Sequence, residues 1–132
     1  MIVAVDTSAL AKLLVEEAES ATLREHLAQR DAAGDTIAIS TIAVTELRRL
    51  AIRLDIEPDH VEPVLRPFRV IRLTEGILQL AGRLAHRHLG TLDAIHIATA
   101  LSIEAQALIT FDTRQTDAAR LEGLAVEAPG VA

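Results

Sequence analysis

Short runs of β-branched and aliphatic residues recur along this chain, and segments with helical spacing of apolar residues separate them. The runs cover residues 2–5, 37–39, 70–73, 107–110 and 124–126. Each is too short for a helix and is largely apolar, which is typical of strands buried on both faces. Strands that alternate with helices favour a parallel sheet, because each crossover helix must return across the sheet. The sequence therefore predicts an α/β fold with three layers, α/β/α, around a central parallel sheet of four to five strands.

Hydroxyl residues precede several of the predicted helices, where they can accept hydrogen bonds from the first free backbone amides. These candidate caps are Thr7 or Ser8, Ser40 or Thr41, Thr74, and Thr91. Three prolines at positions 58, 63 and 67 limit the intervening stretch to a short helical segment at most. The first predicted helix begins near residue 7, and others cover 19–32, about 42–54 and about 92–105. Thr74 caps a further helix that ends near Gly90, and a last helix follows Asp112.

The length and composition favour one soluble domain. The chain has 132 residues, half of them hydrophobic, and no cysteine, which excludes disulfides and thiolate metal sites. No apolar run approaches the roughly 20 residues of a membrane span, and no basic start marks a secretion signal. We expect a single domain over residues 1–132, with 129–132 as a flexible tail, in the cytoplasm and away from membranes.

Four acids are predicted to meet at one edge of the sheet. Asp6 and Asp112 directly follow two strands, and Asp93 begins a helix after the turn at 90–91. Glu46 joins them if the second turn of its helix faces back across that edge. In open parallel sheets, ligands bind outside the carboxyl ends of the strands. A cluster of Asp and Glu without His or Cys favours a hard cation, so the expected ion is Mg²⁺ or Mn²⁺, and the expected chemistry is phosphodiester hydrolysis.

Each acid also has a purely structural explanation. Asp6 can cap the first helix, and Asp93 can be a first-turn acid favoured by the helix dipole. Glu46 can pair with Arg49 on a solvated helix face, and Asp112 can begin a turn. All four explanations holding together is less probable than any one alone.

Further candidates surround these acids. The hydroxyls of Thr7, Ser8 and Thr110 can steady a metal-bound water or only cap. Asp117 is a weaker candidate, since it fits a surface position on the last helix. His96 follows Asp93 by one helical turn and is expected to be packed or to support a ligand. Three arginines beside Glu46 can hold substrate phosphates or form a solvated face, namely Arg48, Arg49 and Arg53.

The charge balance narrows the class of function. The net charge of −6 argues against general electrostatic binding of nucleic acid, so a nucleic-acid role needs local cations or a metal.

Three alternative classes of protein remain to be compared. A phosphorylated receiver domain needs an adjacent acid pair after the first strand, but Thr7 follows Asp6. A phosphatase with an aspartate nucleophile needs a second aspartate where Ser8 stands. A module that binds RNA or a partner without catalysis is the remaining alternative.

An ordered set of motifs along nearly the whole chain resembles the PIN-domain ribonucleases, and in particular the VapC toxins of type II toxin–antitoxin systems. These motifs are Asp6-Thr7-Ser8, Thr45-Glu46-Leu47, Leu92-Asp93-Ala94-Ile95-His96-Ile97-Ala98 and Thr110-Phe111-Asp112.

The resemblance implies a PIN-like domain whose acids Asp6, Glu46, Asp93 and Asp112 bind Mg²⁺ or Mn²⁺, with Thr110 nearby. It implies cleavage of RNA, often tRNA or rRNA, with inhibition of translation. It also implies a homodimer and a VapB-like antitoxin that inserts a segment across the active site. Many members of this family carry another acid at the position of Gln115, so the sequence does not decide whether a second metal binds.

Overall fold

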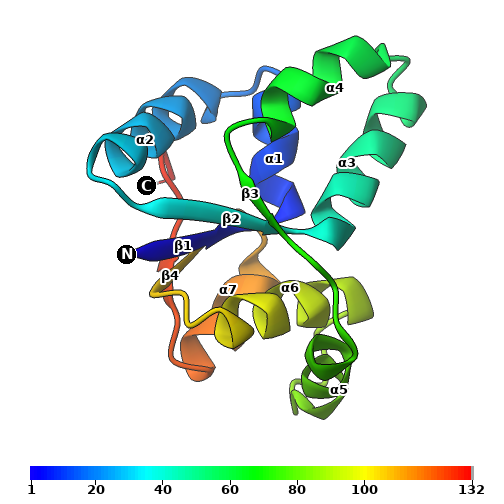
Figure 1. The fold of residues 1–132 in the computed structure, drawn as a ribbon, viewed down its shortest axis with the longest axis vertical. Coiled ribbons are helices and arrows are strands. Elements are labelled where there is room, and N and C mark those ends of the chain that lie inside the picture. The colour runs from blue at the N-terminus through cyan, green and yellow to red at the C-terminus, as the bar shows by residue number, and fades with distance from the viewer. Residues whose placement is uncertain (132) are drawn as a thin grey trace.

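The computed structural model describes residues 1–131 and contains one five-stranded parallel sheet (Figure 1). Its order is β3-β2-β1-β4-β5, and every neighbouring pair is parallel. The predicted fold class is therefore confirmed. The strands are β1 (Ile2–Val5), β2 (Thr36–Ser40), β3 (Arg69–Ile71), β4 (Ala107–Ile109) and β5 (Ala125–Glu127).

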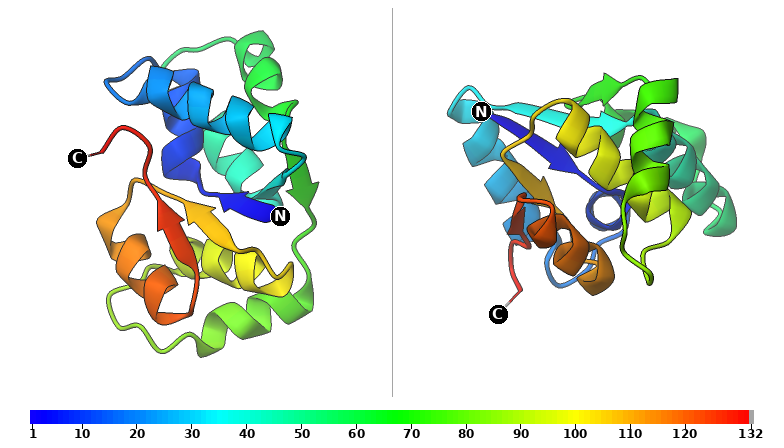
Figure 2. Two further views of the ribbon diagram at one scale, coloured as in Figure 1. Left: turned by 90° about the vertical axis from the view of Figure 1, so that its left-hand side faces the viewer. Right: turned by 90° about the horizontal axis from the view of Figure 1, so that it is seen from below.

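Helices cover both faces of this sheet, as the views in Figures 1 and 2 show. One layer contains α1 (Thr7–Leu14), α2 (Ser20–Ala32), α3 (Thr41–Arg53) and α4 (Pro58–Leu65). The other contains α5 (Glu75–Arg83), α6 (Thr91–Ser102) and α7 (Thr113–Leu121). Within residues 1–131, no helix has both the length and the apolar character needed to cross a lipid bilayer.

The alternation of side chains in β1 divides the core between the two layers. Val3 and Val5 pack with buried residues of the first layer, whereas Ala4 packs with residues of α6 and α7 on the opposite face. Successive side chains of a strand point to opposite faces, so a strand covered on both sides must be apolar throughout. This packing anchors the end of β1, and therefore the position of Asp6.

The predicted ends of several elements were wrong by a few residues. The helix predicted to end near Gly90 is α5, and it ends at Arg83. The segment after it contacts the end of α7, where His86 Nε2 lies 2.7 Å from Glu122 Oε2. The short helix expected among the prolines is α4, which begins at Pro58 because the first turn of a helix needs no amide donor there. Of the predicted tail 129–132, residue 132 lies outside the described part of the chain.

Two predicted helix caps were also wrong. Asp6, rather than Thr7 or Ser8, caps α1 by accepting from the backbone amide of Ala9. Gly90 stands at the cap position of α6 without a side-chain hydrogen bond, so Thr91 is the first helical residue instead. The predicted caps Ser40 and Thr74 are confirmed.

Candidate active site

The carboxyl ends of β1 and β4 form the centre of the candidate site. The chain leaves β1 toward β2, whereas β4 pairs with the other side of β1, so the crossovers diverge between these two strands. Such a divergence opens a crevice above the strand ends in parallel sheets. Asp6 follows β1 directly, and Thr110 follows β4 directly.

Asp6 is buried and held by three donors. The Ser8 hydroxyl donates to Oδ1 at 2.6 Å, the Thr110 hydroxyl donates to Oδ2 at 2.6 Å, and the amide of Ala9 donates to Oδ1 at 3.2 Å. Burial raises the pKa of Asp6, and these hydrogen bonds partly oppose the rise. The expected capping role of Asp6 is therefore confirmed, and the same carboxylate lies at the carboxyl end of β1.

The same two hydroxyls also fix the chain after β4. Ser8 Oγ accepts from the amide of Phe111 at 2.9 Å, and Thr110 Oγ1 accepts from the amide of Asp112 at 3.1 Å. Each hydroxyl donates to Asp6 and accepts from this turn, so both of its hydrogen-bonding functions are used. Asp6 and the backbone of Asp112 are thereby locked together, although they are far apart in the sequence.

Glu46 extends from the second turn of α3 toward the first and sixth helices. Its Oε1 accepts from the Thr7 hydroxyl at 2.6 Å and lies 2.7 Å from His96 Nε2. Partial burial opposes ionisation of Glu46, but the hydrogen bonds from His96 and Thr7 outweigh it and lower the pKa of this carboxyl. The alternative of a Glu46–Arg49 pair is wrong, because among residues 1–131 the side chains that contact the Glu46 carboxylate at hydrogen-bond distance are Thr7 and His96.

Asp93 shows that the four acids share one neighbourhood. Partial burial raises the pKa of Asp93, and the negative charges of Asp112, Asp6 and Glu46 each raise it further, while His96 lowers it. Like charges shift a pKa in this way only at short range. The carboxylate of Asp93 has no hydrogen-bond donor within residues 1–131. It is the acid with the least compensation in the site.

Asp112 caps α7, and Gln115 lies beneath it. Asp112 Oδ1 accepts from the amides of Arg114 at 2.9 Å and Gln115 at 3.4 Å. The fully buried amide of Gln115 reaches the backbone carbonyl of Asp93 at 3.5 Å, and its Oε1 has no partner among the described residues. The first turns of α6 and α7 therefore meet at this side chain, a contact that sequence reasoning missed because nothing local marks it.

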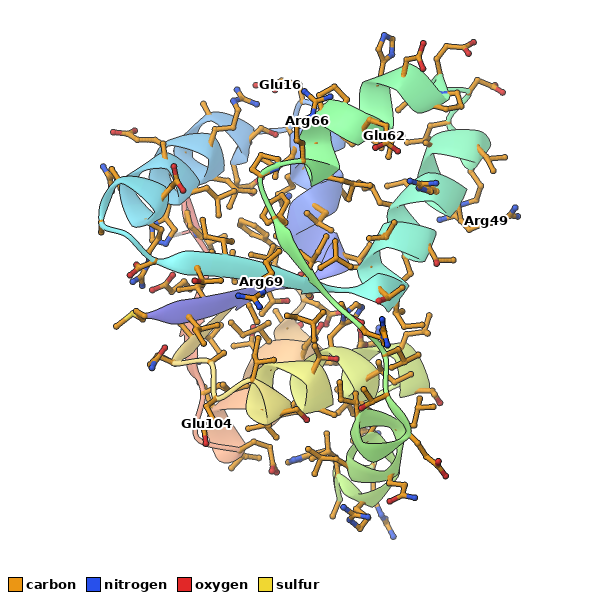
Figure 3. All side chains as sticks on the ribbon, in the orientation of Figure 1. Glu16, Arg49, Glu62, Arg66, Arg69 and Glu104 are labelled. Atoms are coloured by element: carbon orange, nitrogen blue, oxygen red, sulfur yellow. The ribbon has the colours of Figure 1, made fainter. Side chains whose placement is uncertain are left out.

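The structure separates the remaining candidates. Asp117 lies on the exposed face of α7, as its spacing favoured. Arg48 pairs with Glu62 of α4 at 2.8 Å. Arg49 and Arg53 are exposed on α3, and Arg49 projects away from the molecule in Figure 3.

The donor set suits a hard cation, although the side chains are not arranged around one. Within residues 1–131, no three acidic or histidine side chains are spaced as a ready-made metal group. Asp6 and Glu46 point oxygens at hydroxyl and imidazole donors, while Asp93 and Asp112 repel each other. A divalent cation would offset this repulsion, and carboxylate oxygens are the ligands that Mg²⁺ and Mn²⁺ prefer.

Comparisons with known proteins identify relatives over almost the whole chain. Residues 3–121 match the family model described as the PIN domain. The protein named Ribonuclease VapC47, from Mycobacterium tuberculosis (strain CDC 1551 / Oshkosh), is 36% identical over 130 residues, which cover 95% of each chain. Ribonuclease VapC46, from M. tuberculosis (strain ATCC 25618 / H37Rv), is 37% identical over 126 residues, covering 94% of this chain and 95% of that one. A toxin–antitoxin complex from Klebsiella pneumoniae contains a chain with a TM-score of 0.73 and 26% identity, covering 96% of this chain and 97% of that chain.

Proposed function

Because this chain belongs to the PIN domain family, as its motifs indicated, we propose that it is a metal-dependent endoribonuclease and the toxin of a type II toxin–antitoxin pair. The observation that carries the proposal is that hydrogen bonds tie Asp6 to the turn before Asp112 at the carboxyl ends of β1 and β4, while the charges of Asp6, Glu46 and Asp112 all act on Asp93. The two relatives from M. tuberculosis are both named as ribonucleases, and this supports the same activity.

Mg²⁺ or Mn²⁺ is the proposed cofactor. Asp6, Asp93 and Asp112 would hold the ion directly or through water, and Glu46 would act as a further ligand or as a base. A bound divalent cation supplies a water activated for attack and offsets charge on the scissile phosphate. Burial and the neighbouring carboxylates raise the pKa of Asp93, which supports this assignment, because a cation would offset both effects on the charged form.

The protein's own side chains divide the remaining work. Ser8 and Thr110 hold Asp6 in one orientation and keep the Asp112 turn beside it. Glu46 stays ionised because its pKa is lowered, so it suits a ligand better than a strong base. Its Oε2 is the atom that would contact the cation or orient the attacking water.

RNA is the proposed substrate, with Arg49 and Arg53 as phosphate contacts. Both are exposed on the helix that carries Glu46, and neither forms an ion pair among the described residues. Guanidinium groups match phosphate geometry, and they give the acidic protein local cations for its polyanionic substrate. Arg48 is less suited to bind phosphate, because its guanidinium already forms an ion pair with Glu62.

A VapB-like antitoxin is the proposed partner, and a homodimer the proposed assembly. The toxin–antitoxin complex from K. pneumoniae supports the choice of partner. We expect such a partner to place a cationic segment over the four acids, and we place the pair in the cytoplasm, where cellular RNA is translated.

The test is cleavage of total RNA by the purified protein in Mg²⁺, in Mn²⁺ and in EDTA. We expect cleavage in either metal, with 5′-phosphate and 3′-hydroxyl ends, and none in EDTA. Asp6→Asn should abolish cleavage, and it should lower thermal stability in EDTA by a small amount, because its amide nitrogen would face a hydroxyl that donates to Asp6 in the unmodified protein. Cleavage that persists in EDTA or in Asp6→Asn refutes the assigned site, and RNA binding without cleavage in either metal identifies a binding module instead.

A further inference from the structure

The two oxygens of Glu46 have different environments. Oε1 receives the Thr7 hydroxyl from the first turn of α1 and faces His96 Nε2 from the second turn of α6. Oε2 has no hydrogen-bond partner among residues 1–131. The three residues come from three helices that are separated widely in sequence, so the contact exists only in the folded chain.

The hydrogen-bond pattern assigns the direction of each contact. The Thr7 hydroxyl has one proton, and at 2.6 Å it donates to the carboxylate. His96 Nε2 lies 3.3 Å from that hydroxyl and 2.7 Å from Oε1, so the network is satisfied when Nε2 carries a proton and donates to Oε1. His96 is only 4% exposed and lies in a helix buried along most of its length, so its ring is fixed by packing.

We propose that Thr7 and His96 are positioning residues that hold Oε1 of Glu46, so that Glu46 reaches the cation or its bound water through Oε2 alone. This inference rests on the proposed function and makes it more specific. A glutamate on a helix has three rotatable side-chain bonds, and fixing them costs conformational entropy when an ion binds. Because Thr7 and His96 fix the Glu46 side chain when the protein folds, this entropy is lost before the ion binds. The same two donors leave Glu46 only one oxygen, Oε2, with which to contact the ion.

Matched variants separate positioning from packing. His96→Gln keeps an amide donor near the place of Nε2, whereas His96→Asn is too short to reach and His96→Leu has no donor. Thr7→Ser keeps the hydroxyl, and Thr7→Val removes it at nearly constant shape. A role in packing alone predicts that leucine and valine are tolerated as well as glutamine and serine.

The experiment measures the dissociation constant of Mn²⁺ by electron paramagnetic resonance, the Mn²⁺ dependence of RNA cleavage, and thermal unfolding in EDTA. Loss of a group that orients a metal ligand typically weakens metal binding or activity about 10-fold to 100-fold. We expect His96→Leu, His96→Asn and Thr7→Val to weaken Mn²⁺ binding by about 10-fold and to lower kcat with little change in KM for RNA. His96→Gln and Thr7→Ser should stay within about threefold of the unmodified protein.

A Glu46→Ala background provides the control. If His96 acts through Glu46, adding His96→Leu to Glu46→Ala leaves Mn²⁺ affinity unchanged, because no carboxylate remains to be positioned. The thermal shifts of the two changes in EDTA should likewise be less than additive. Should His96→Leu not fold, the comparison of asparagine with glutamine decides the question.

The outcomes distinguish this inference from the proposed function. Equal Mn²⁺ affinity in all His96 and Thr7 variants, or full additivity with Glu46→Ala, overturns the positioning role and leaves the nuclease assignment intact. Absence of metal-dependent cleavage by the unmodified protein overturns the nuclease assignment, while the Mn²⁺ titrations and the EDTA cycle still report on the contact.

Discussion

Replacing Asp93 by asparagine should stabilise the metal-free protein while abolishing its activity. The Asp93 carboxylate accepts no hydrogen bond among the described residues, so the isosteric change removes a charge without breaking a contact. Burial and the charges of Asp112, Asp6 and Glu46 all raise the pKa of Asp93. The charged form therefore opposes folding at neutral pH.

The size of this effect follows from the exposure of Asp93. The side chain is only half-buried, so solvent screening limits the combined repulsion to about 1 kcal/mol. For a chain of this length, about 1 kcal/mol corresponds to a rise in Tm of roughly 3–4 °C. Between the ordinary pKa of 3.8 and its raised value in the folded state, the folded protein binds more protons than the unfolded chain. Stability of the unmodified protein therefore falls as pH rises through that window, and the advantage of Asp93→Asn should be absent below it and complete at pH 7.

Calorimetry in EDTA at pH 7, at low and high KCl, measures this advantage, which salt should reduce. Glu25→Gln, on the exposed face of α2, makes the same change in net charge and should leave Tm nearly unchanged. Adding Mn²⁺ should reverse the order, because only the unmodified protein retains the full set of acids and gains stability from binding. A lower Tm for Asp93→Asn in EDTA, or equal stabilisation of both proteins by Mn²⁺, would refute the electrostatic reasoning.

Other predictions test the core, the backbone and the substrate surface. Leu47→Ala removes a fully buried side chain and should cost about 3 kcal/mol in urea unfolding; a cost below about 1 kcal/mol would mean that this core readily collapses. Gly34 has a φ of 84° with nothing near its Cβ position, so Gly34→Ala should destabilise by about 1 kcal/mol, whereas Gly82→Ala, in open space on α5, should stabilise by about 0.5 kcal/mol; calorimetry of the pair checks both signs. Arg49→Glu should raise KM for RNA and weaken its salt dependence, with a smaller effect for Arg48→Glu because Arg48 is already paired with an acid; equal effects in RNA-binding titrations would contradict this distinction.

The sequence by itself determined the architecture and the chemical type of the candidate site. Apolar runs such as Ile2–Val5 could be recognised as buried strands because a strand covered on both faces must be apolar throughout, and this constraint is local. The four acids could be predicted to meet because the carboxyl ends of parallel strands and the starts of the helices that follow them lie at one edge.

Only the tertiary structure decided how each side chain is used. The Thr110–Asp6 hydrogen bond spans 104 positions of the sequence, and the Glu46–His96 contact spans 50. The ion pair of Arg48 with Glu62 joins two different helices. Such distant contacts also explain why Asp6 rather than Thr7 or Ser8 caps α1. The Ser8 hydroxyl donates to Asp6 and accepts from the amide of Phe111, and the Thr7 hydroxyl donates to Glu46. Helical and strand periodicity reports which face of an element is buried, but hydrogen-bond partners depend on distances between elements, and these arise only when the layers pack.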